Sequence, residues 1–155
     1  MYQDARLLVS GSIGVDNVIT PQTVTGTSTT VVSTNTVDLS QARDIGEGFE
    51  VCGRAQVATA VAGGTSVEVQ VITSAAANLS SPTVLGTSGA IPVASLVAGK
   101  RLVIDINPQI ASLAQRYIGV QYVLVGTVTA GAWVSDFGIE IQGGQKFYPV
   151  GYAVL

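Results

Sequence analysis

The feature that most limits what this chain can fold into is an alternation of apolar and polar residues with a period of two. Between Phe49 and Val57 the odd positions are apolar or glycine, and the even positions are Glu, Cys, Arg and Gln. Such alternation is typical of a β-strand with one face on a core and the other toward solvent or a partner. The run Ser66–Val71 repeats the pattern after the turn-like residues 62–65. We therefore predict that the two runs pair as a hairpin.

Further strands are predicted where β-branched and aromatic residues gather. They lie over 101–106, 118–125 and 132–141, and the Thr- and Val-rich residues 23–39 add one or two more. The last of these strands places its aromatic residues on one side, so it should supply much of the core. A turn is expected at 129–131, between two of the strands.

Little helix is predicted. Single short helical turns could form within 92–97, which begins at Pro92, and within 109–115, which follows Pro108. Many short strands separated by turn signals predict an all-β fold, an antiparallel β-sandwich that resembles a jelly roll. The 155 residues suit one domain. Glycine-containing breaks set off an N-terminal arm over 1–14 and a C-terminal arm over 145–155, whose aromatic residues should pack on their own domain or on a neighbouring subunit.

Charge is scarce, because only 11% of the residues are charged against an ordinary value of about 25%. A surface with so few charges indicates burial against other subunits. The net charge of -3 and the dispersed basic residues argue against a nucleic-acid partner, because phosphate contacts need clustered Lys and Arg. The adjacent pair Lys100 and Arg101 is explained as the solvated start of a strand.

Residues 117–134 carry no charge and nearly reach the length of a membrane-spanning helix. Their three glycines and their Val and Thr content predict strands instead, so no membrane partner is expected. The N-terminus lacks the basic region and long apolar run of a signal peptide, which predicts a protein made and kept in a cytosol. A single cysteine, Cys52, permits no internal disulfide and agrees with that compartment.

Catalytic chemistry is not expected, because the chain has no histidine to serve as a general base or a metal ligand. Asp136 and Glu140 share a strand face, but four residues of strand separate them by about 13 Å, beyond the roughly 5 to 9.5 Å between paired glycosidase carboxylates. We predict that they belong to a solvated face. The acidic residues 44–50 lack the ligand pattern of a calcium loop and should form a connection. We expect no enzyme, no cofactor and no metal.

Two kinds of side chain leave alternatives open. Cys52 lies on the polar face of its strand and is expected to be a partly accessible filler residue rather than a nucleophile. The aromatic residues Tyr117, Tyr122, Trp133 and Phe137 could line a sugar-binding face, although their strand spacing favours the core. A carbohydrate-binding β-sandwich module therefore remains an alternative function.

Several short stretches, in their order and spacing along the chain, resemble one family: the capsid cement, or decoration, proteins of tailed phages, in particular the group of the cement protein of a Bordetella podophage. None is diagnostic alone. The stretches are Met1–Ala5, Ser33–Leu39 leading into Ala42–Gly48, Ala62–Ser66, Leu79–Pro82, Leu96–Gly99, Arg116–Gly119 and Gly126–Gly131.

The resemblance implies a jelly roll or related sandwich that forms a homotrimer on the outer surface of an expanded capsid and cements neighbouring major capsid proteins against internal pressure. A phage tail or fibre accessory protein is the other alternative. We expect contacts to the capsid or to sister subunits from the N-terminal arm, from one loop and from the C-terminal arm: Tyr2, Gln3, Asp4, Arg6, Arg43, Asp44, Glu47, Phe147, Tyr148 and Tyr152.

Overall fold

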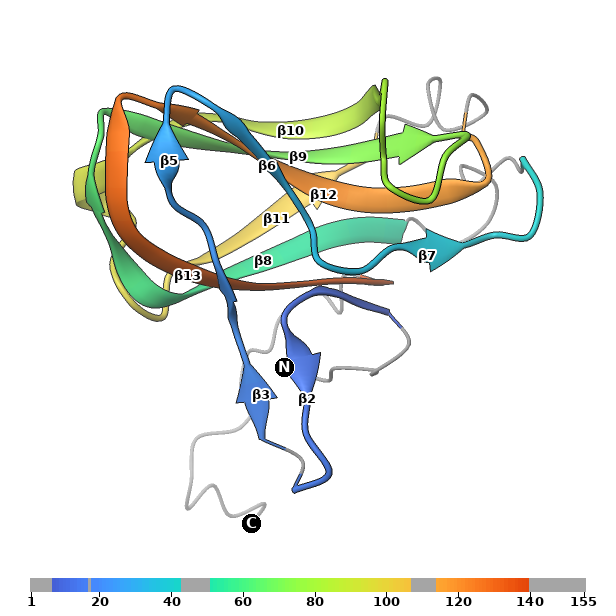
Figure 1. The fold of residues 1–155 in the computed structure, drawn as a ribbon, viewed down its shortest axis with the longest axis horizontal. Coiled ribbons are helices and arrows are strands. Elements are labelled where there is room, and N and C mark those ends of the chain that lie inside the picture. Colours follow the sequence, from blue (N-terminus) through green and yellow to red (C-terminus); the bar gives the residue numbers. More distant parts are fainter. Residues whose placement is uncertain (1–6, 17, 43–50, 107–113, 140–155) are drawn as a thin grey trace, which may run out of the picture.

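Most strands of the computed structural model form two large antiparallel sheets that pack against each other (Figure 1), and β2 and β3 form a separate two-stranded sheet. The structure describes residues 7–16, 18–42, 51–106 and 114–139. Its elements are β1 (Leu8–Ser10), β2 (Ser12–Ile13), β3 (Ile19–Thr20), β4 (Gln22–Thr23), β5 (Gly26–Thr27), β6 (Thr30–Val32), β7 (Val37–Asp38), β8 (Val51–Gly63), β9 (Ser66–Ser74), β10 (Thr83–Pro92), the 3₁₀ turn η1 (Val93–Ser95), β11 (Arg101–Asp105), β12 (Tyr117–Val125) and β13 (Thr127–Ile139).

The order of the strands is that of a jelly roll. One sheet runs β1-β13-β8-β11, with β4 and β5 also paired to β13, and the other runs β10-β9-β12-β6, with β7 paired to β12. Along the chain, β9 and β10 pair within one sheet, and the other connections from β8 to β13 cross between the sheets, as in the Greek keys of this fold. The predicted antiparallel, jelly-roll-like β-sandwich is therefore confirmed.

The predicted hairpin between the runs 49–57 and 66–71 is wrong. Strand β8 pairs with β11 and β13, whereas β9 pairs with β10 and β12, so the turn between them carries the chain from one sheet to the other. Gly63 and Gly64 have φ values of +73° and +72°, which suit glycine. The β12–β13 turn crosses between the sheets at the same corner, where a Cβ on Gly126 would lie 3.0 Å from the Cα of Gly64.

The core lies between the sheets and contains the side chains that the alternation assigned to it. Val67, Val69 and Val71 are buried, as predicted, and so are Trp133 and Tyr122, whose rings lie 5.3 Å apart. The Tyr122 hydroxyl donates to the Ser10 Oγ at 2.8 Å and also lies 2.6 Å from the Ser135 Oγ, so a buried polar contact joins the two sheets. Burial raises the pKa of Tyr122 to about 12.

Other predicted strands are confirmed with changed limits. Strands β11 and β12 lie where expected, and η1 forms the expected turn within 92–97, whereas most of 109–115 lies outside the described residues. The turn predicted at 129–131 is wrong, since these residues lie inside β13, where the register with β8 shifts. Residues 23–39, predicted to add one or two strands, instead hold the end of β4 and the three short strands β5, β6 and β7. Strand β10 was not predicted, because its glycines and register shifts interrupt the alternation.

Part of the segment expected as an N-terminal arm belongs to the sandwich. Leu8, Val9 and Ser10 are buried in β1 at the edge of the six-stranded sheet. After them, β2 and β3 pair in a hairpin that stands away from the sandwich (Figure 1). Residues 1–6 and the expected C-terminal arm over 145–155 lie outside the described residues. Within the described chain, no helix has the length and apolar character needed to cross a membrane.

Candidate interaction surfaces

The residues predicted to make contacts all lie outside the described part of the chain. They fall in the three segments 1–6, 43–50 and 140–155. The predicted group comprises Tyr2, Gln3, Asp4, Arg6, Arg43, Asp44, Glu47, Phe147, Tyr148 and Tyr152. Their contacts therefore stay predictions, and the surfaces described below come from other residues.

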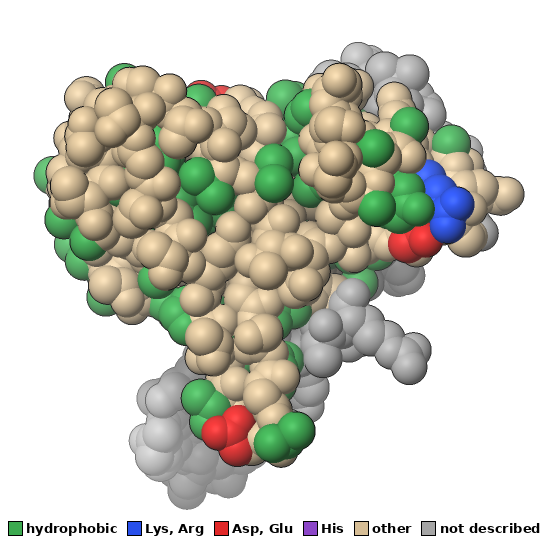
Figure 2. Space-filling view, in the orientation of Figure 1, with side chains coloured by type: hydrophobic (Ala, Val, Ile, Leu, Met, Phe, Trp, Pro, Cys, Tyr) green, Lys and Arg blue, Asp and Glu red, His purple; other side chains and the backbone are tan. Residues whose placement is uncertain are grey.

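The tip of the β2–β3 hairpin exposes two valines. Val15 is 109% exposed and Val18 is 58% exposed. The tip is closed by the Gly14 N–H, which donates to the Val18 carbonyl oxygen at 2.9 Å, and by the Val18 N–H, which donates to Asp16 Oδ1 at 3.1 Å. Figure 2 shows apolar and acidic side chains together at this tip. Apolar side chains on a closed, protruding tip can insert into a partner.

A charged pair lies on the outer face of the six-stranded sheet. Arg54 on β8 and Asp136 on β13 are register partners, and the guanidinium binds the carboxylate through Nε to Oδ1 at 2.9 Å and through NH2 to Oδ2 at 2.7 Å. The side chains are 17% and 0% exposed. The prediction that Asp136 belongs to a solvated face is therefore wrong, whereas Glu140 lies outside the described residues.

The surroundings of this pair are closely packed. A Cβ on Gly138 would lie 2.6 Å from the Arg54 Cζ, so the guanidinium occupies the space that the glycine leaves free. Cys52 beside it is 3% exposed and donates to the Gly138 carbonyl oxygen at 3.3 Å, so its expected accessibility is wrong. Burial raises the pKa of Asp136 above its ordinary value, although the hydrogen bonds and charge of Arg54 act in the opposite direction.

The pair was missed because its members lie 82 positions apart in the sequence. The available signal was a single acid in the predominantly apolar run from Ala132 to Phe137. A carboxylate in such a strand requires a hydrogen-bonded or charged partner if its face becomes buried. Which arginine supplies that partner depends on the register between β8 and β13.

The outer face of the five-stranded sheet carries a row of polar side chains instead. The Thr87 hydroxyl and the Gln70 amide both donate to Glu68 Oε1 at 2.6 Å, and the Gln121 amide donates to Gln70 Oε1 at 2.5 Å. The row therefore crosses β10, β9 and β12. The bonds from Thr87 and Gln70 lower the pKa of Glu68, because they stabilise its ionised form.

A second ion pair lies at the end of the sandwich near β7. Arg116 binds Asp38 through two bonds of 2.9 Å, and its guanidinium lies 5.1 Å from the centre of the half-buried Tyr117 ring. Both charged side chains are exposed, at 49% and 44%. Hydrogen bonding from Arg116 lowers the pKa of Asp38. Figure 2 shows basic and acidic side chains in contact at the β7 end of a face that carries few other charges.

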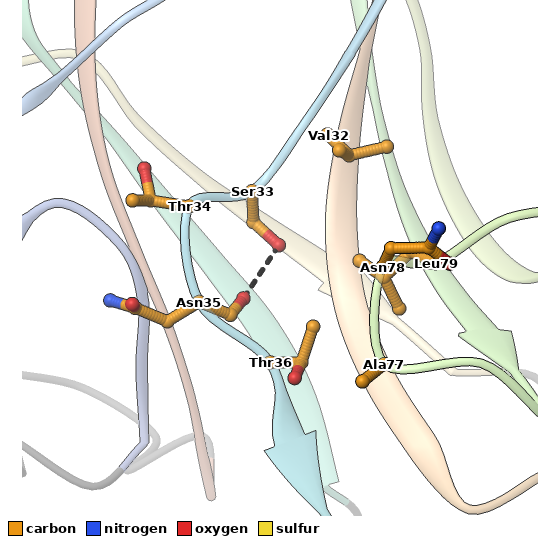
Figure 3. Close-up of a pocket in the computed structure, with 8 residues that line it drawn as sticks. All are labelled: Val32, Ser33, Thr34, Asn35, Thr36, Ala77, Asn78 and Leu79. Atoms are coloured by element: carbon orange, nitrogen blue, oxygen red, sulfur yellow. Dashed lines mark hydrogen bonds between the residues drawn. The ribbon is translucent and has the colours of Figure 1, made fainter.

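A polar hollow of about 520 Å³ opens between two loops (Figure 3). Residues 32–36 form one wall and residues 77–79 face them from the other. The Ser33 hydroxyl donates to the Asn35 carbonyl oxygen at 2.9 Å and accepts the Val120 N–H, so it is already engaged. The described lining has hydroxyls and amides but no aromatic ring. Tyr122, Trp133 and Phe137 are in the core, as their spacing favoured, and give no exposed sugar-stacking platform.

Within the described ranges, no group of three or more His, Cys, Asp or Glu side chains is placed to hold a metal ion. Asp38 and Asp136 bind arginine, and Glu68 accepts hydrogen bonds from neutral donors.

Comparison with protein families gives a match that covers most of the chain. The family model described as Bbp16, a Bordetella phage protein family, matches residues 18–136. The matched range begins at the β2–β3 hairpin and ends at Asp136, so it includes nearly all of both sheets. A search of curated proteins found no match.

Proposed function

This chain belongs to the Bbp16 family of Bordetella phage proteins, and from that premise we propose that it is a structural protein of the virion, bound to the outer surface of the capsid. The family match over most of the chain is the observation that carries the proposal. The scarcity of charged residues in the sequence, also seen on the face in Figure 2, supports it, since a charge-poor surface suits burial against other subunits.

The proposed role is to cement neighbouring major capsid proteins against internal pressure. A cement protein needs several modest contacts held at fixed positions, because linked contacts strengthen one another through multivalency. A homotrimer presents three equal sets of contacts around one axis. We propose this assembly state, with no catalytic activity, cofactor or metal, and with synthesis in the host cytoplasm before the protein joins the virion.

The hairpin tip is the proposed capsid contact within the described residues. Val15 and Val18 are exposed in the isolated chain, and burial of each valine in a partner would contribute about 1.5 kcal/mol or more. The predicted residues of the segments 1–6, 43–50 and 147–155 would add contacts around it. A tip and several flanking segments together provide the repeated, individually modest contacts that cementing needs.

Co-sedimentation with expanded phage heads tests this proposal. We expect the double variant Val15→Asp with Val18→Asp to lose about tenfold or more in affinity, because two apolar contacts become charged. Val97→Asp is the matched control, since Val97 is also 58% exposed but lies beside η1. If the hairpin variant and the control bind heads equally well, the hairpin tip does not contact the capsid.

Deletion of residues 147–155 tests the C-terminal arm in the same assay, and light-scattering mass tests the trimer. The chain has a mass of 15.8 kDa, so a particle of three times that mass is expected. A particle of one or two chain masses would contradict the trimer. Failure of the wild-type protein to bind heads, or labelling of the virion on its tail, would contradict the capsid role itself.

A further inference from the structure

The tip of the β2–β3 hairpin carries one acid between its two exposed valines. Asp16 is exposed, and Val15 and Val18 flank it in the sequence. Figure 2 shows an acidic side chain between apolar side chains at this tip. Ile13 and Ile19 oppose each other in the last register pair before the tip, and both are half-buried. The tip is therefore an apolar knob that carries a single negative charge.

The turn holds the carboxylate of Asp16 in place. Its Oδ1 accepts the Val18 N–H at 3.1 Å, and the Gly14 N–H donates to the Val18 carbonyl oxygen at 2.9 Å. A Cβ on Gly14 would lie 2.5 Å from Oδ1, so the acid uses the space that the glycine leaves free. Among the described residues, no hydrogen bond is made by the other oxygen, Oδ2. A fixed carboxylate with one free oxygen can accept a charged donor from a partner.

The acid of the tip also lacks a counter-charge within the described chain. The ion pairs in that part of the chain are Arg54 with Asp136 and Arg116 with Asp38. Water solvates Asp16 in the isolated chain, so it needs no partner there. If the valines beside it are buried in a partner surface, the acid loses that water as well. A carboxylate that loses its water then requires an opposite charge or hydrogen-bond donors.

The direction of the hairpin determines which surface can supply that charge. The hairpin stands away from the sandwich on the side of β13 and β8, and the five-stranded sheet lies on the other side (Figure 1). From Ser12 to Asp16, four residues of extended chain reach about 13 Å. A narrow knob of this length is suited to enter a depression in a larger surface.

Resting on the proposed function, we propose that the tip enters an apolar depression of the major capsid protein and that a lysine or arginine at the edge of this depression binds Asp16. The two groups of the tip then have different tasks. Burial of Val15 and Val18 is non-directional and contributes affinity. The ion pair fixes the register of the tip and steers its approach. The inference thus deepens the proposed capsid contact by giving the chemistry of the partner surface.

Co-sedimentation with expanded heads at several salt concentrations tests the ion pair. Asp16→Asn keeps the oxygen that accepts the Val18 N–H and removes only the charge. We expect about tenfold weaker binding at low salt and a smaller dependence of the affinity on salt than in the wild type, because salt screens an ion pair that the variant lacks. Glu68→Gln is the matched control, since it removes one negative charge from the opposite sheet. It should keep the affinity and the salt dependence of the wild type.

Two further variants separate the sign of the charge from its position. Asp16→Lys should bind heads about a hundredfold more weakly, because two like charges then meet at the interface. Gly14→Ala keeps the charge but moves the carboxylate, so it should bind about threefold more weakly, because a charged hydrogen bond weakens when its geometry changes. An affinity of Gly14→Ala equal to that of the wild type would contradict the fixed position of the acid.

The outcomes distinguish this inference from the proposed function. If the wild type binds heads and Asp16→Asn binds with the same affinity and salt dependence, the ion pair is wrong and the capsid role stands. Failure of the wild type to bind heads would contradict both. Light scattering of the isolated Asp16→Asn protein should give the wild-type mass. A changed mass would assign the tip to a contact between copies of this chain and overturn the capsid partner.

Discussion

The outer faces of the two sheets shift the pKa values of their acidic residues in opposite directions. On the six-stranded sheet, Asp136 is fully buried with Arg54, and burial raises its pKa. On the five-stranded sheet, Glu68 is half-buried beside Thr87 and Gln70, whose hydrogen bonds lower its pKa.

The difference shows that the outer face of a strand is not always a solvated face. Both acids point away from the core. The inner face of β13 carries Trp133, and the inner face of β9 carries Val69. Desolvation dominates where the face is covered, and hydrogen bonding dominates where water still reaches the carboxylate. The buried acid on the six-stranded sheet is therefore compensated by a charged partner, and the acid on the five-stranded sheet by neutral donors.

The largest expected effect comes from breaking that pair. Asp136→Asn should lower the free energy of unfolding by about 3 to 5 kcal/mol, because the Asn amide turns an N–H donor toward the Arg54 guanidinium, whose donors then lack one of their two buried acceptors. Urea unfolding measures the change. The double variant Arg54→Met with Asp136→Leu is the control, and it should recover most of the loss, since apolar residues of similar size remove both buried charges. A double variant as unstable as Asp136→Asn would contradict this account.

A smaller effect is expected from filling the space beside the guanidinium. Gly138→Ala places a methyl group against the Arg54 Cζ, and the displaced side chain should cost about 1 to 3 kcal/mol in unfolding free energy. In an Arg54→Met background the same change should cost much less, because the flexible thioether can yield. Equal costs in the two backgrounds would show that the methyl group meets something other than Arg54.

The smallest effect at neutral pH is expected on the other sheet. Glu68→Gln should change the free energy of unfolding by only about 0.5 kcal/mol, since the side chain stays partly in water and solvent weakens its interactions. Thermal unfolding at pH 7 measures it. A loss as large as that of Asp136→Asn would remove the contrast between the two faces.

The pH dependence of unfolding sharpens the same contrast. The lowered pKa of Glu68 contributes stability above its ordinary value of 4.5, and this stability is lost as the pH falls through the folded pKa. The raised pKa of Asp136 acts in reverse, so its contribution is present below the ordinary value of 3.8 and is lost as the pH rises through the folded pKa. From about pH 3 to pH 6, the stability of wild type relative to Glu68→Gln should rise, and that relative to Asp136→Asn should fall.

Much of the sandwich could be predicted because strand formation is local. The valines of β9 and the strands β11 and β12 follow from the alternation of neighbouring residues. The sequence could not decide whether β8 and β9 pair with each other. Gly63 and Gly64 permit a tight turn within one sheet and also a crossing between sheets. Only the pairing of both strands with distant partners distinguishes the two.

By itself, the sequence determined the strand-rich fold class, the composition of the core and the family, since these depend on residue patterns along the chain. The tertiary structure decided which strands are neighbours and therefore what each outward side chain meets. Asp136 became buried with Arg54 because the register between β13 and β8 places the two residues opposite each other. Residues far apart in the sequence interact only after the sheets form, so no local pattern records these contacts.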